Sequence, residues 1–316
     1  MGGHDLSRHR IALIVNPAAG SGRAGRLSAM VAERLHARAS VQVLAGSSAS
    51  ESAELLAAAA GACDAALVLG GDGTVHLALQ ALALGDTPLG IIPGGTGNDM
   101  VDVLGLPGDP MSAVDAALTA LDAGSVRRLD LGRTEAGQWW STVLCAGFDS
   151  AVNERADRLR WPRGPRRYDV AIMAEMVRLA PRPFTVRLDG VTLDVRATLV
   201  AIGNAPQYGG GKRITPDGRM DDGEFAVTIV GPVSRLTLAR LAPTLPRAGH
   251  IGHPAVSTYT ARSVWFDAPS TFGYADGERI GLLPLGSTCI AGALPVLIPA
   301  GTTGRAFSEH SQPRGG

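Results

Sequence analysis

The chain has 316 residues, and at roughly 150 residues per domain this length predicts two domains with a sizeable core. Hydrophobic residues make up 45% of the chain and aromatic residues 4%, which excludes an intrinsically disordered protein and argues against an aromatic platform for nucleic acid. Its 29 Lys and Arg residues balance 29 Asp and Glu residues, so the formal net charge is +0. Because a neutral chain has no general attraction to a phosphate backbone, any anion must be recognised by local geometry.

The cysteines and the N-terminus indicate the compartment. Cys63, Cys145 and Cys289 are far apart, odd in number and without the spacing of metal ligands, a pattern that fits a reducing cytosol. The N-terminal segment has no apolar stretch like that of a signal peptide, and Leu6 stands where a myristoylation motif requires Ser or Thr. The longest apolar stretches are far too short to cross a bilayer. We therefore expect a cytoplasmic protein whose contact with a membrane is peripheral.

The first part of the chain alternates apolar strands with helical patterns. Arg10–Val15 is a continuous apolar run, which predicts a strand buried on both faces of a parallel sheet. Further strands are predicted at Val41–Leu44, Ala65–Leu69 and Leu89–Ile92. Helical patterns follow three of the four strands, at Leu27–Leu35, in an Ala-rich stretch after SSASES and around Val75–Leu84. Strand, loop and helix repeated at this spacing predict an α/β domain over residues 8–130, with its ligand site at the carboxyl ends of the strands.

The second part of the chain has a different texture. Short alternating segments, separated by Gly, Pro and Asp clusters, predict an antiparallel sheet domain over residues 131–299: Phe184–Leu188, Leu193–Val200, Phe225–Val230 and Val264–Phe266. One helix is expected near Asp169–Leu179. The segment Leu294–Ile298 is compatible with a last strand in either domain, and residues 300–316 are expected to form a disordered tail.

Three glycine-bearing loops follow three of the predicted parallel strands. They are Asn16–Arg23 (NPAAGSGR), Gly70–Thr74 (GGDGT) and Pro93–Asp99 (PGGTGND). Glycine lets a backbone approach a ligand closely, and a helix that starts after such a loop presents unpaired N–H groups to an anion. The GGDGT loop is neither a Walker A loop nor the GxGxxG dinucleotide fingerprint. One such loop is compatible with an ordinary turn, and Asp72 with a helix cap, but three loops that converge on one crevice predict a phosphate site.

The order of these loops resembles the catalytic domain of the diacylglycerol kinase and sphingosine kinase superfamily, in particular its soluble bacterial lipid kinases. Further motifs in the second half extend the resemblance: LDLG at Leu129–Gly132, AGFDSAV at Ala146–Val152, NAPQYGGG at Asn204–Gly211, PDGRMDDGEF at Pro216–Phe225 and DGE at Asp276–Glu278. GGDGT alone also resembles the corresponding loop of NAD kinases and phosphofructokinases. The whole set covers nearly the entire chain and is therefore much more specific than any single motif.

The resemblance implies an α/β nucleotide-binding domain and an antiparallel β-sandwich domain that meet over a cleft. It also implies an ATP- and Mg²⁺-dependent kinase that transfers the γ-phosphoryl group to a lipid hydroxyl, most simply that of diacylglycerol to give phosphatidic acid. Sphingoid bases, phosphatidylglycerol and other hydroxyl lipids stay open as substrates. Two rivals also stay open: an NAD kinase, and a non-catalytic nucleotide- or lipid-binding regulator descended from a kinase. A homodimer is a further open alternative.

The resemblance also assigns roles to individual residues. The positions that would line the ATP site are Asn16, Pro17, Ala18, Ala19, Gly20, Ser47, Gly71, Asp72, Gly73, Thr74 and Thr96. The positions that would surround catalytic Mg²⁺ through water are Asp72, Asp99 and Asp130, and a separate structural Mg²⁺ site is matched at Asp222 and Glu224. Asp276 matches the general base of the family and Glu278 the acidic residue paired with it. From the residues alone, a DG hairpin corner is the favoured interpretation of Asp276, and Asp222 is equally compatible with a simple turn between strands.

A basic segment stands out in the otherwise neutral chain. It contains Arg158, Arg160 and Arg163 around Trp161. The segment is compatible with a solvated helix end, and also with a contact to anionic lipid in which Trp161 sits at the depth of the headgroups. A lipid kinase without a membrane span needs some surface of the second kind.

Overall fold

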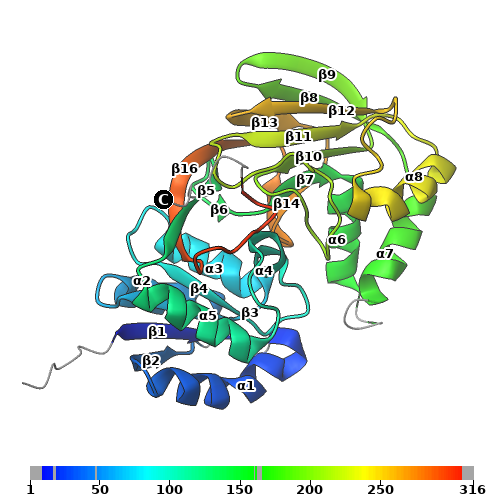
Figure 1. Ribbon diagram of the computed structural model, residues 1–316. Helices are drawn as coiled ribbons and strands as arrows, with labels where there is room; N and C mark the ends of the chain where they lie inside the picture. The colour runs from blue at the N-terminus through cyan, green and yellow to red at the C-terminus, as the bar shows by residue number, and fades with distance from the viewer. Residues whose placement is uncertain (1–8, 17–18, 47, 160, 162–165, 308–316) are drawn as a thin grey trace, which may run out of the picture. The chain divides into compact units, whose positions relative to one another are not determined.

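The computed structural model describes residues 9–16, 19–46, 48–159, 161 and 166–307 (Figure 1). The chain divides into two compact units. Unit 1 comprises residues 1–129 and 292–304, and unit 2 comprises residues 130–291 and 305–316. For comparison, the sequence predicted domains of residues 8–130 and 131–299, with the place of the last strand left open.

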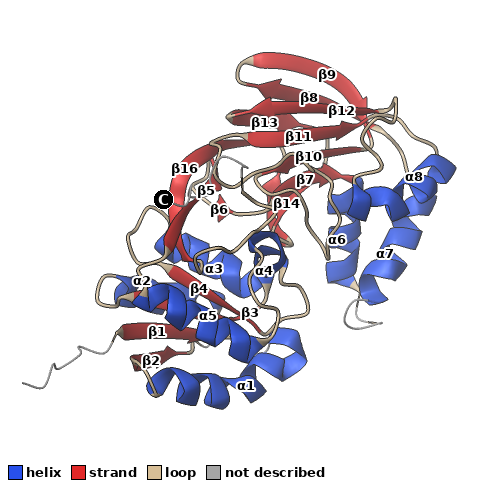
Figure 2. Ribbon diagram, in the orientation of Figure 1, coloured by secondary structure: helices blue, strands red, loops and turns tan. Residues whose placement is uncertain are grey.

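Unit 1 contains a parallel sheet in the order β2-β1-β3-β4, with the end of β16 parallel to β4. Its elements are β1 (Arg10–Val15), α1 (Ala19–His36), β2 (Ser40–Leu44), α2 (Ala49–Ala60), β3 (Ala65–Gly70), α3 (Asp72–Leu82), β4 (Leu89–Pro93), α4 (Asp99–Leu104) and α5 (Pro110–Asp122). Helices α1 and α5 pack on one face of these strands, and α2 and α3 pack on the other (Figure 2). Strands β1 and β3 are buried on both faces, which explains their continuous apolar sequences.

Unit 2 is a sandwich of two mainly antiparallel sheets. One sheet runs in the order β12-β11-β10-β7-β14-β15, and the other contains β13, β8 and β9 beside the first part of β16. Its elements are β6 (Trp139–Trp140), β7 (Val143–Gly147), α6 (Phe148–Arg158), α7 (Arg166–Val177), β8 (Arg182–Leu188), β9 (Val191–Ala197), β10 (Leu199–Gly203), β11 (Phe225–Val230), α8 (Arg235–Leu241), the 3₁₀ helix η1 (Ala242–Arg247), β12 (Val256–Ala261), β13 (Ser263–Asp267), β14 (Phe272–Ala275) and β15 (Glu278–Leu282).

Two further strands connect the units along the chain. These are β5 (Val126–Thr134) and β16 (Leu285–Leu297), and each has residues in both units. Alternate residues of both sheets in unit 2 point into one apolar core, where the rings of Trp140 and Phe225 stack at 5.0 Å between centroids. The predicted fold class, an α/β domain with an antiparallel β-sandwich domain, is confirmed.

The structure corrects two of the predicted elements. The stretch before Leu27, expected to be a loop, is helical from Ala19. Ala24 in this part of α1 is fully buried, and a Cβ on Gly94 would lie 3.1 Å from its Cβ. The segment expected as one strand over Leu193–Val200 is two strands, since the chain crosses from one sheet to the other at Thr198, where the hydroxyl donates to the carbonyl of Gly231.

The end of the chain also differs from the prediction of a disordered tail from residue 300. Residues 300–307 belong to the described structure, and Ala306 is fully buried. The carbonyl of Ala306 accepts a hydrogen bond from the amide of Met220, and Arg305 donates to the side chain of Gln207. The segment is ordered by these tertiary contacts, which its polar, glycine-containing sequence does not reveal.

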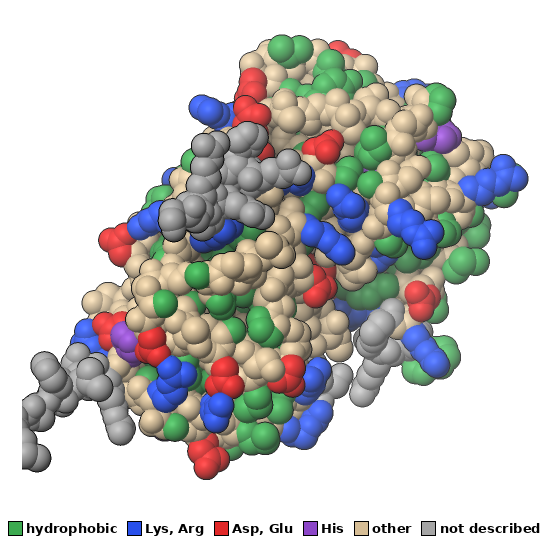
Figure 3. Space-filling view, in the orientation of Figure 1, with side chains coloured by type: hydrophobic (Ala, Val, Ile, Leu, Met, Phe, Trp, Pro, Cys, Tyr) green, Lys and Arg blue, Asp and Glu red, His purple; other side chains and the backbone are tan. Residues whose placement is uncertain are grey.

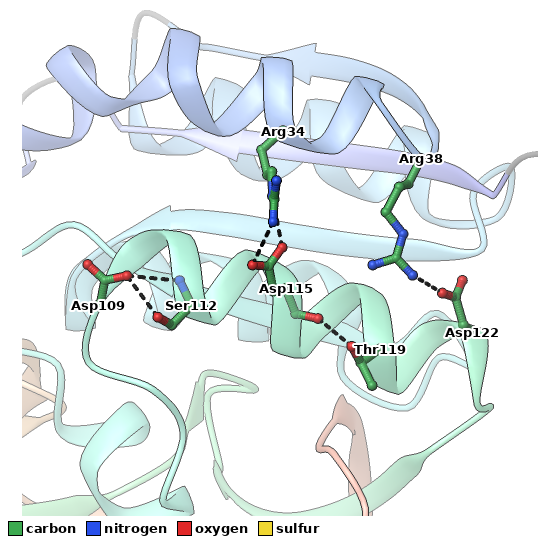
Figure 4. A network of polar contacts seen from close by, with 7 residues as sticks. All are labelled: Arg34, Arg38, Asp109, Ser112, Asp115, Thr119 and Asp122. Atoms are coloured by element: carbon green, nitrogen blue, oxygen red, sulfur yellow. Dashed lines mark hydrogen bonds and ion pairs between the residues drawn. The ribbon is translucent and has the colours of Figure 1, made fainter.

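A ladder of ion pairs joins α1 to α5 on the surface of unit 1 (Figure 4). Arg34 donates two hydrogen bonds of 2.9 Å to the two carboxylate oxygens of Asp115, and Arg38 pairs with Asp122. The hydrogen bond from Arg34 lowers the pKa of Asp115. Since all four side chains are substantially exposed, these pairs fix the register of the two helices more than they add stability.

Candidate active site

The three glycine-bearing loops leave the parallel sheet of unit 1 at the same edge. The pairing places Val15 beside Leu69, and Gly70 beside Pro93, so β1, β3 and β4 end level with one another. The carboxyl ends of adjacent parallel strands, each followed by the start of a helix, form the usual ligand-binding edge of an open α/β sheet. The structure therefore brings together the loops that the sequence singled out.

Glycines let two of these loops pack backbone against backbone. A Cβ on Gly95 would lie 2.4 Å from the Cα of Gly71, and one on Gly71 would lie 2.8 Å from the carbonyl oxygen of Gly97. The amides of Gly94 and Gly95 both donate to the carbonyl of Gly70, at 2.7 and 3.1 Å. Gly71 has a φ of −114°, so close approach and not a left-handed backbone is the reason for glycine there.

Asp72 connects the second loop to the third. It is the first residue of α3, whose N-cap, Gly71, makes no side-chain capping bond. One carboxylate oxygen of Asp72 accepts a 2.7 Å hydrogen bond from the amide of Asp99, the first residue of α4, and the amide of Asp72 donates to the carbonyl of Gly97. The carboxylate of Asp72 thus accepts a hydrogen bond from the backbone at the start of the neighbouring helix α4.

Two buried polar atoms in these loops have no hydrogen-bond partner. They are the hydroxyl oxygen of Thr74, a residue only 3% exposed, and the side-chain carbonyl oxygen of Asn98. Unpaired buried polar atoms are costly and call for an explanation, such as a bound ligand. The predicted nucleotide site is one that these atoms would fit. Asn98 was not among the predicted site residues, although it lies within the quoted motif PGGTGND.

The remaining predicted nucleotide residues lie around this edge. Asn16 directly follows β1, and its amide donates to the carbonyl of Leu69; Ala19 and Gly20 open α1. Gly73 and Thr96 are exposed. Pro17, Ala18 and Ser47 lie outside the described residues.

Asp276 occupies a hairpin corner in unit 2 and is held by donors from another part of the sheet. With φ values of 54° and 82°, Asp276 and Gly277 form the two-residue turn between β14 and β15, so the hairpin reading is correct. One carboxylate oxygen accepts from the amide of Ser141 at 2.8 Å, and the other accepts from the amide and the hydroxyl of Thr142 at 2.8 and 2.7 Å. The carboxylate therefore has a fixed orientation.

A buried asparagine extends this arrangement to a second predicted acidic position. Asn204 is fully buried, and its amide nitrogen donates to the carbonyls of Ser141 at 2.7 Å and of Asp130 at 2.8 Å. The carboxylate of Asp130 accepts from the amide of Gly223 at 2.6 Å. One hydrogen-bonded network thus fixes Asp276, Asp130 and the loop around Gly223. The roles of Asn204 and Ser141 were missed, because only tertiary pairing brings them to the carboxylates.

Carboxylates gather around Asp222, in the same loop as Gly223. Burial, together with the nearby charges of Asp130, Asp221 and Glu224, raises the pKa of Asp222. One oxygen of Asp222 accepts a 3.1 Å hydrogen bond from the amide of Glu224, as in a simple turn. Among the residues that the structure describes, no group of three or more His, Cys, Asp and Glu side chains is arranged to hold a metal ion. The predicted metal ligands stay predictions.

Glu278 differs from Asp276 in its surroundings. It is the first residue of β15, where it pairs with Ala275 of β14, and its side chain is exposed. The structure therefore positions Asp276 firmly and leaves Glu278 at the surface of unit 2.

The basic segment is only partly described. The side chain of Arg158 is 76% exposed and forms an ion pair with Glu154 within α6, and Trp161 is 81% exposed. Arg160 and Arg163 lie outside the described residues. Over the part of the chain that the structure describes, no helix has the length and apolar character needed to span a bilayer.

Comparisons with known proteins agree with both units. Residues 10–134 match the family model described as the diacylglycerol kinase catalytic domain, and residues 142–298 match the YegS C-terminal NAD kinase beta sandwich-like domain. The chain is 40% identical over 311 residues to the diacylglycerol kinase of Mycobacterium tuberculosis (strain ATCC 25618 / H37Rv), which covers 95% of this chain and 99% of that protein. It is 29% identical to the "Probable lipid kinase YegS-like" of Stenotrophomonas maltophilia (strain K279a), over 75% and 80% of the two chains.

A solved structure also shares the fold. The crystal structure of a diacylglycerol kinase from Bacillus anthracis str. Sterne superposes with a TM-score of 0.72 over 95% of this chain and all of that one, at 20% sequence identity. Together with the family models and the relative at 40% identity, the arrangement of the glycine loops and the sandwich defines a lipid kinase of the diacylglycerol kinase type. The chain belongs to the diacylglycerol kinase family, and it is a phosphotransferase by that membership.

Proposed function

We propose that this protein transfers the γ-phosphoryl group of ATP to the hydroxyl of a membrane lipid, in a reaction that depends on Mg²⁺, and that diacylglycerol is its acceptor and phosphatidic acid its product. Family membership supports the kinase chemistry. Relatives named as diacylglycerol kinases and as a lipid kinase favour a lipid acceptor over NAD. The structural observation that carries the proposal furthest is the network that fixes Asp276 and Asp130.

The nucleotide would lie on the loops of unit 1. The N-terminus of α3 opens with Asp72 and Gly73, and a helix N-terminus favours negative charge. The unpaired oxygens of Thr74 and Asn98 supply polar contacts beside it. Asn16 and Thr96, at the ends of the neighbouring loops, would complete the polar lining together with the backbone of the first loop.

A divalent metal fits the acidic positions that the family resemblance assigned. Mg²⁺ in nucleotide sites is held by one or two carboxylates, by water and by the phosphates themselves, so a preformed cluster of three protein ligands is not required. The resemblance assigns Asp72, Asp99 and Asp130 to Mg²⁺ through water, and when bound the metal would neutralise charge on the phosphates. The second predicted site, at Asp222 and Glu224, has the carboxylates of Asp130 and Asp221 as neighbours.

In this mechanism Asp276 accepts the proton of the lipid hydroxyl as that oxygen attacks phosphorus. Phosphoryl transfer depends mainly on positioning and electrostatics, so a carboxylate held in one orientation suits this role. A hairpin corner by itself needs only a residue that tolerates the left-handed backbone, and Asn or Gly would serve. The hydroxyl of Thr142 and the link through Ser141 to Asn204 go beyond that requirement.

The chain offers a matched control for Asp276. Asp189 and Gly190 form a second two-residue turn, between β8 and β9, with φ values of 47° and 89°. The carboxylate of Asp189 accepts from the amides of Arg262 and Ser263, at 2.8 to 3.1 Å. An Asp→Asn change at either corner therefore removes the same charge from the same kind of turn. Only the change at Asp276 should affect the chemical step.

The first experiment incubates the protein with labelled ATP and Mg²⁺ and with dioctanoylglycerol, sphingosine, phosphatidylglycerol or NAD. We expect label in a lipid product, and first in phosphatidic acid. Phosphorylation of NAD without any lipid product, or no phosphorylation at all, would overturn the proposal.

The second experiment compares D276N with D189N in single-turnover kinetics at saturating MgATP and lipid. Because D276N keeps the shape of the side chain and loses its basicity, we expect its rate to fall by roughly 10² to 10⁴ with ATP affinity nearly unchanged. D189N should keep the parental rate. If D276N keeps a near-parental rate of the chemical step, Asp276 is not the general base and only forms the turn.

A further inference from the structure

The solvent-facing side of α7 carries three large apolar side chains beside the charged Arg166 and Asp169. Its exposed side chains include Val170, Met173 and Val177, which are 43%, 68% and 65% exposed. At 100° per residue these three lie within an arc of about 60° on one face of the helix. Ala171, in contrast, is fully buried against α6. Scattered exposed apolar residues need no explanation, but three that form a stripe along one helix do.

The stripe continues onto α8. The guanidinium of Arg235, the first residue of α8, donates to the carbonyl of Val177 at the end of α7. The next residue, Leu236, is 60% exposed. Figure 1 shows α6, α7 and α8 grouped on one side of unit 2. We call the three exposed apolar side chains of α7, together with Leu236 at the start of α8, the apolar stripe: Val170, Met173, Val177 and Leu236.

Arginines lie on the helices that follow the apolar stripe. Helix α8 and the 3₁₀ helix η1 together contain three arginines and no acidic residue, although the overall charge of the chain is zero. Arg166, Arg178 and Arg240 are exposed at the ends of α7 and on α8, and Figure 3 shows Lys and Arg side chains in this part of unit 2. On α7, Glu175 is already paired with Arg155, and Asp169 is the acidic residue on the exposed face.

We propose that the apolar stripe and the arginines around it form the surface by which the protein docks onto an anionic lipid bilayer. An apolar face flanked by arginines matches the acyl boundary and the anionic headgroups respectively. Helix α7 has 12 residues and is about 18 Å long, too short to cross the bilayer core of about 30 Å, so it lies in the interface plane. Docking on this surface would bring the proposed lipid kinase to its lipid substrate. Vesicle binding can be measured without kinase activity.

The test measures co-sedimentation with vesicles of POPC alone and of POPC with 30% POPG. The variant V170S/M173Q/V177S removes most of the apolar stripe without changing charge, and V191S/L282Q is the matched control, because Val191 and Leu282 are 64% and 55% exposed elsewhere on unit 2. We expect the stripe variant to lose binding to the anionic vesicles by at least about tenfold, and the control to bind as the parent does. R178Q/R240Q should bind less at low salt and differ little at high salt, since exposed charges are screened.

Circular dichroism and thermal unfolding establish that each variant is folded. Equal vesicle binding by the parent and the folded stripe variant overturns the proposal. The proposal is also wrong if the parent dimerises in sedimentation velocity and the stripe variant loses dimerisation but keeps vesicle binding. In that case a second copy of the chain covers the stripe. Turnover of monomeric dioctanoylglycerol should be the same in parent and stripe variant. If neither protein phosphorylates a lipid, the proposed function is wrong. Vesicle binding still tests whether the apolar stripe is the docking surface.

Discussion

The contact between the second and third glycine loops gives a prediction whose size follows from the structure. A methyl group added at Gly95 would lie 2.4 Å from the Cα of Gly71, 2.9 Å from its nitrogen and 3.0 Å from the carbonyl oxygen of Gly97. All three atoms belong to backbone, so the loops must separate by about 1 Å to restore van der Waals contact. Overpacking of this kind costs about 1–3 kcal/mol, and we expect G95A to lower the free energy of unfolding by that amount.

The same change should disturb the nucleotide site, and Gly73 separates the two effects. Separating the loops pulls on the 2.7 Å bond between the amide of Asp99 and the carboxylate of Asp72, so G95A should also weaken MgATP binding. Gly73 is exposed in the first turn of α3, and alanine there improves helix propensity by up to about 1 kcal/mol. We therefore expect G73A to be as stable as the parent or more so, and still to bind MgATP less well, because its methyl group crowds the phosphates.

Urea denaturation and titration calorimetry with MgATP measure both quantities. The control is G61A: Gly61 caps α2 with a right-handed backbone, and a Cβ there meets nothing within 4 Å. Its stability and nucleotide affinity should match the parent. A G95A protein of parental stability would refute the packing argument. A G73A protein of parental MgATP affinity would show that the phosphates do not bind at the N-terminus of α3.

Three further changes test other parts of the structure. N204L leaves two buried carbonyls without a donor and should lower the free energy of unfolding, measured in urea, by about 2–5 kcal/mol. A smaller loss would show that the network contributes little to stability. S48A removes the acceptor for the amide of Glu51 at the N-cap of α2 and should cost about 1 kcal/mol in the same assay, whereas no loss would mean that this cap is replaced by water. Burial lowers the pKa of His250, whose ring contacts the carbonyl of Ile214, so the unfolded chain takes up a proton first as pH falls through about 6.5. Stability should therefore fall below that pH more steeply in the parent than in H250Q, and parallel profiles would contradict this.

The sequence by itself determined the elements whose signals are local. The apolar run Arg10–Val15 is a strand with those bounds, and so is Phe225–Val230, because burial on both faces requires continuous apolar sequence. The loops that contain Asp72 and Asp99 could also be assigned to one edge, since parallel strands that share a sheet end on the same side. The resemblance of the motifs gave the family, which the comparisons confirmed.

What only the tertiary structure decided are the contacts between residues far apart in the chain. Asn204 meets Ser141 and Asp130 because β10 pairs with β7, and 63 or more positions separate the partners in sequence. Periodicity and motif spacing describe neighbours within one element and carry no information about such pairings. The same limit applies to the apolar stripe: the sequence predicted a helix near Asp169–Leu179, and only its packing, with Ala171 inward, shows which side chains face out.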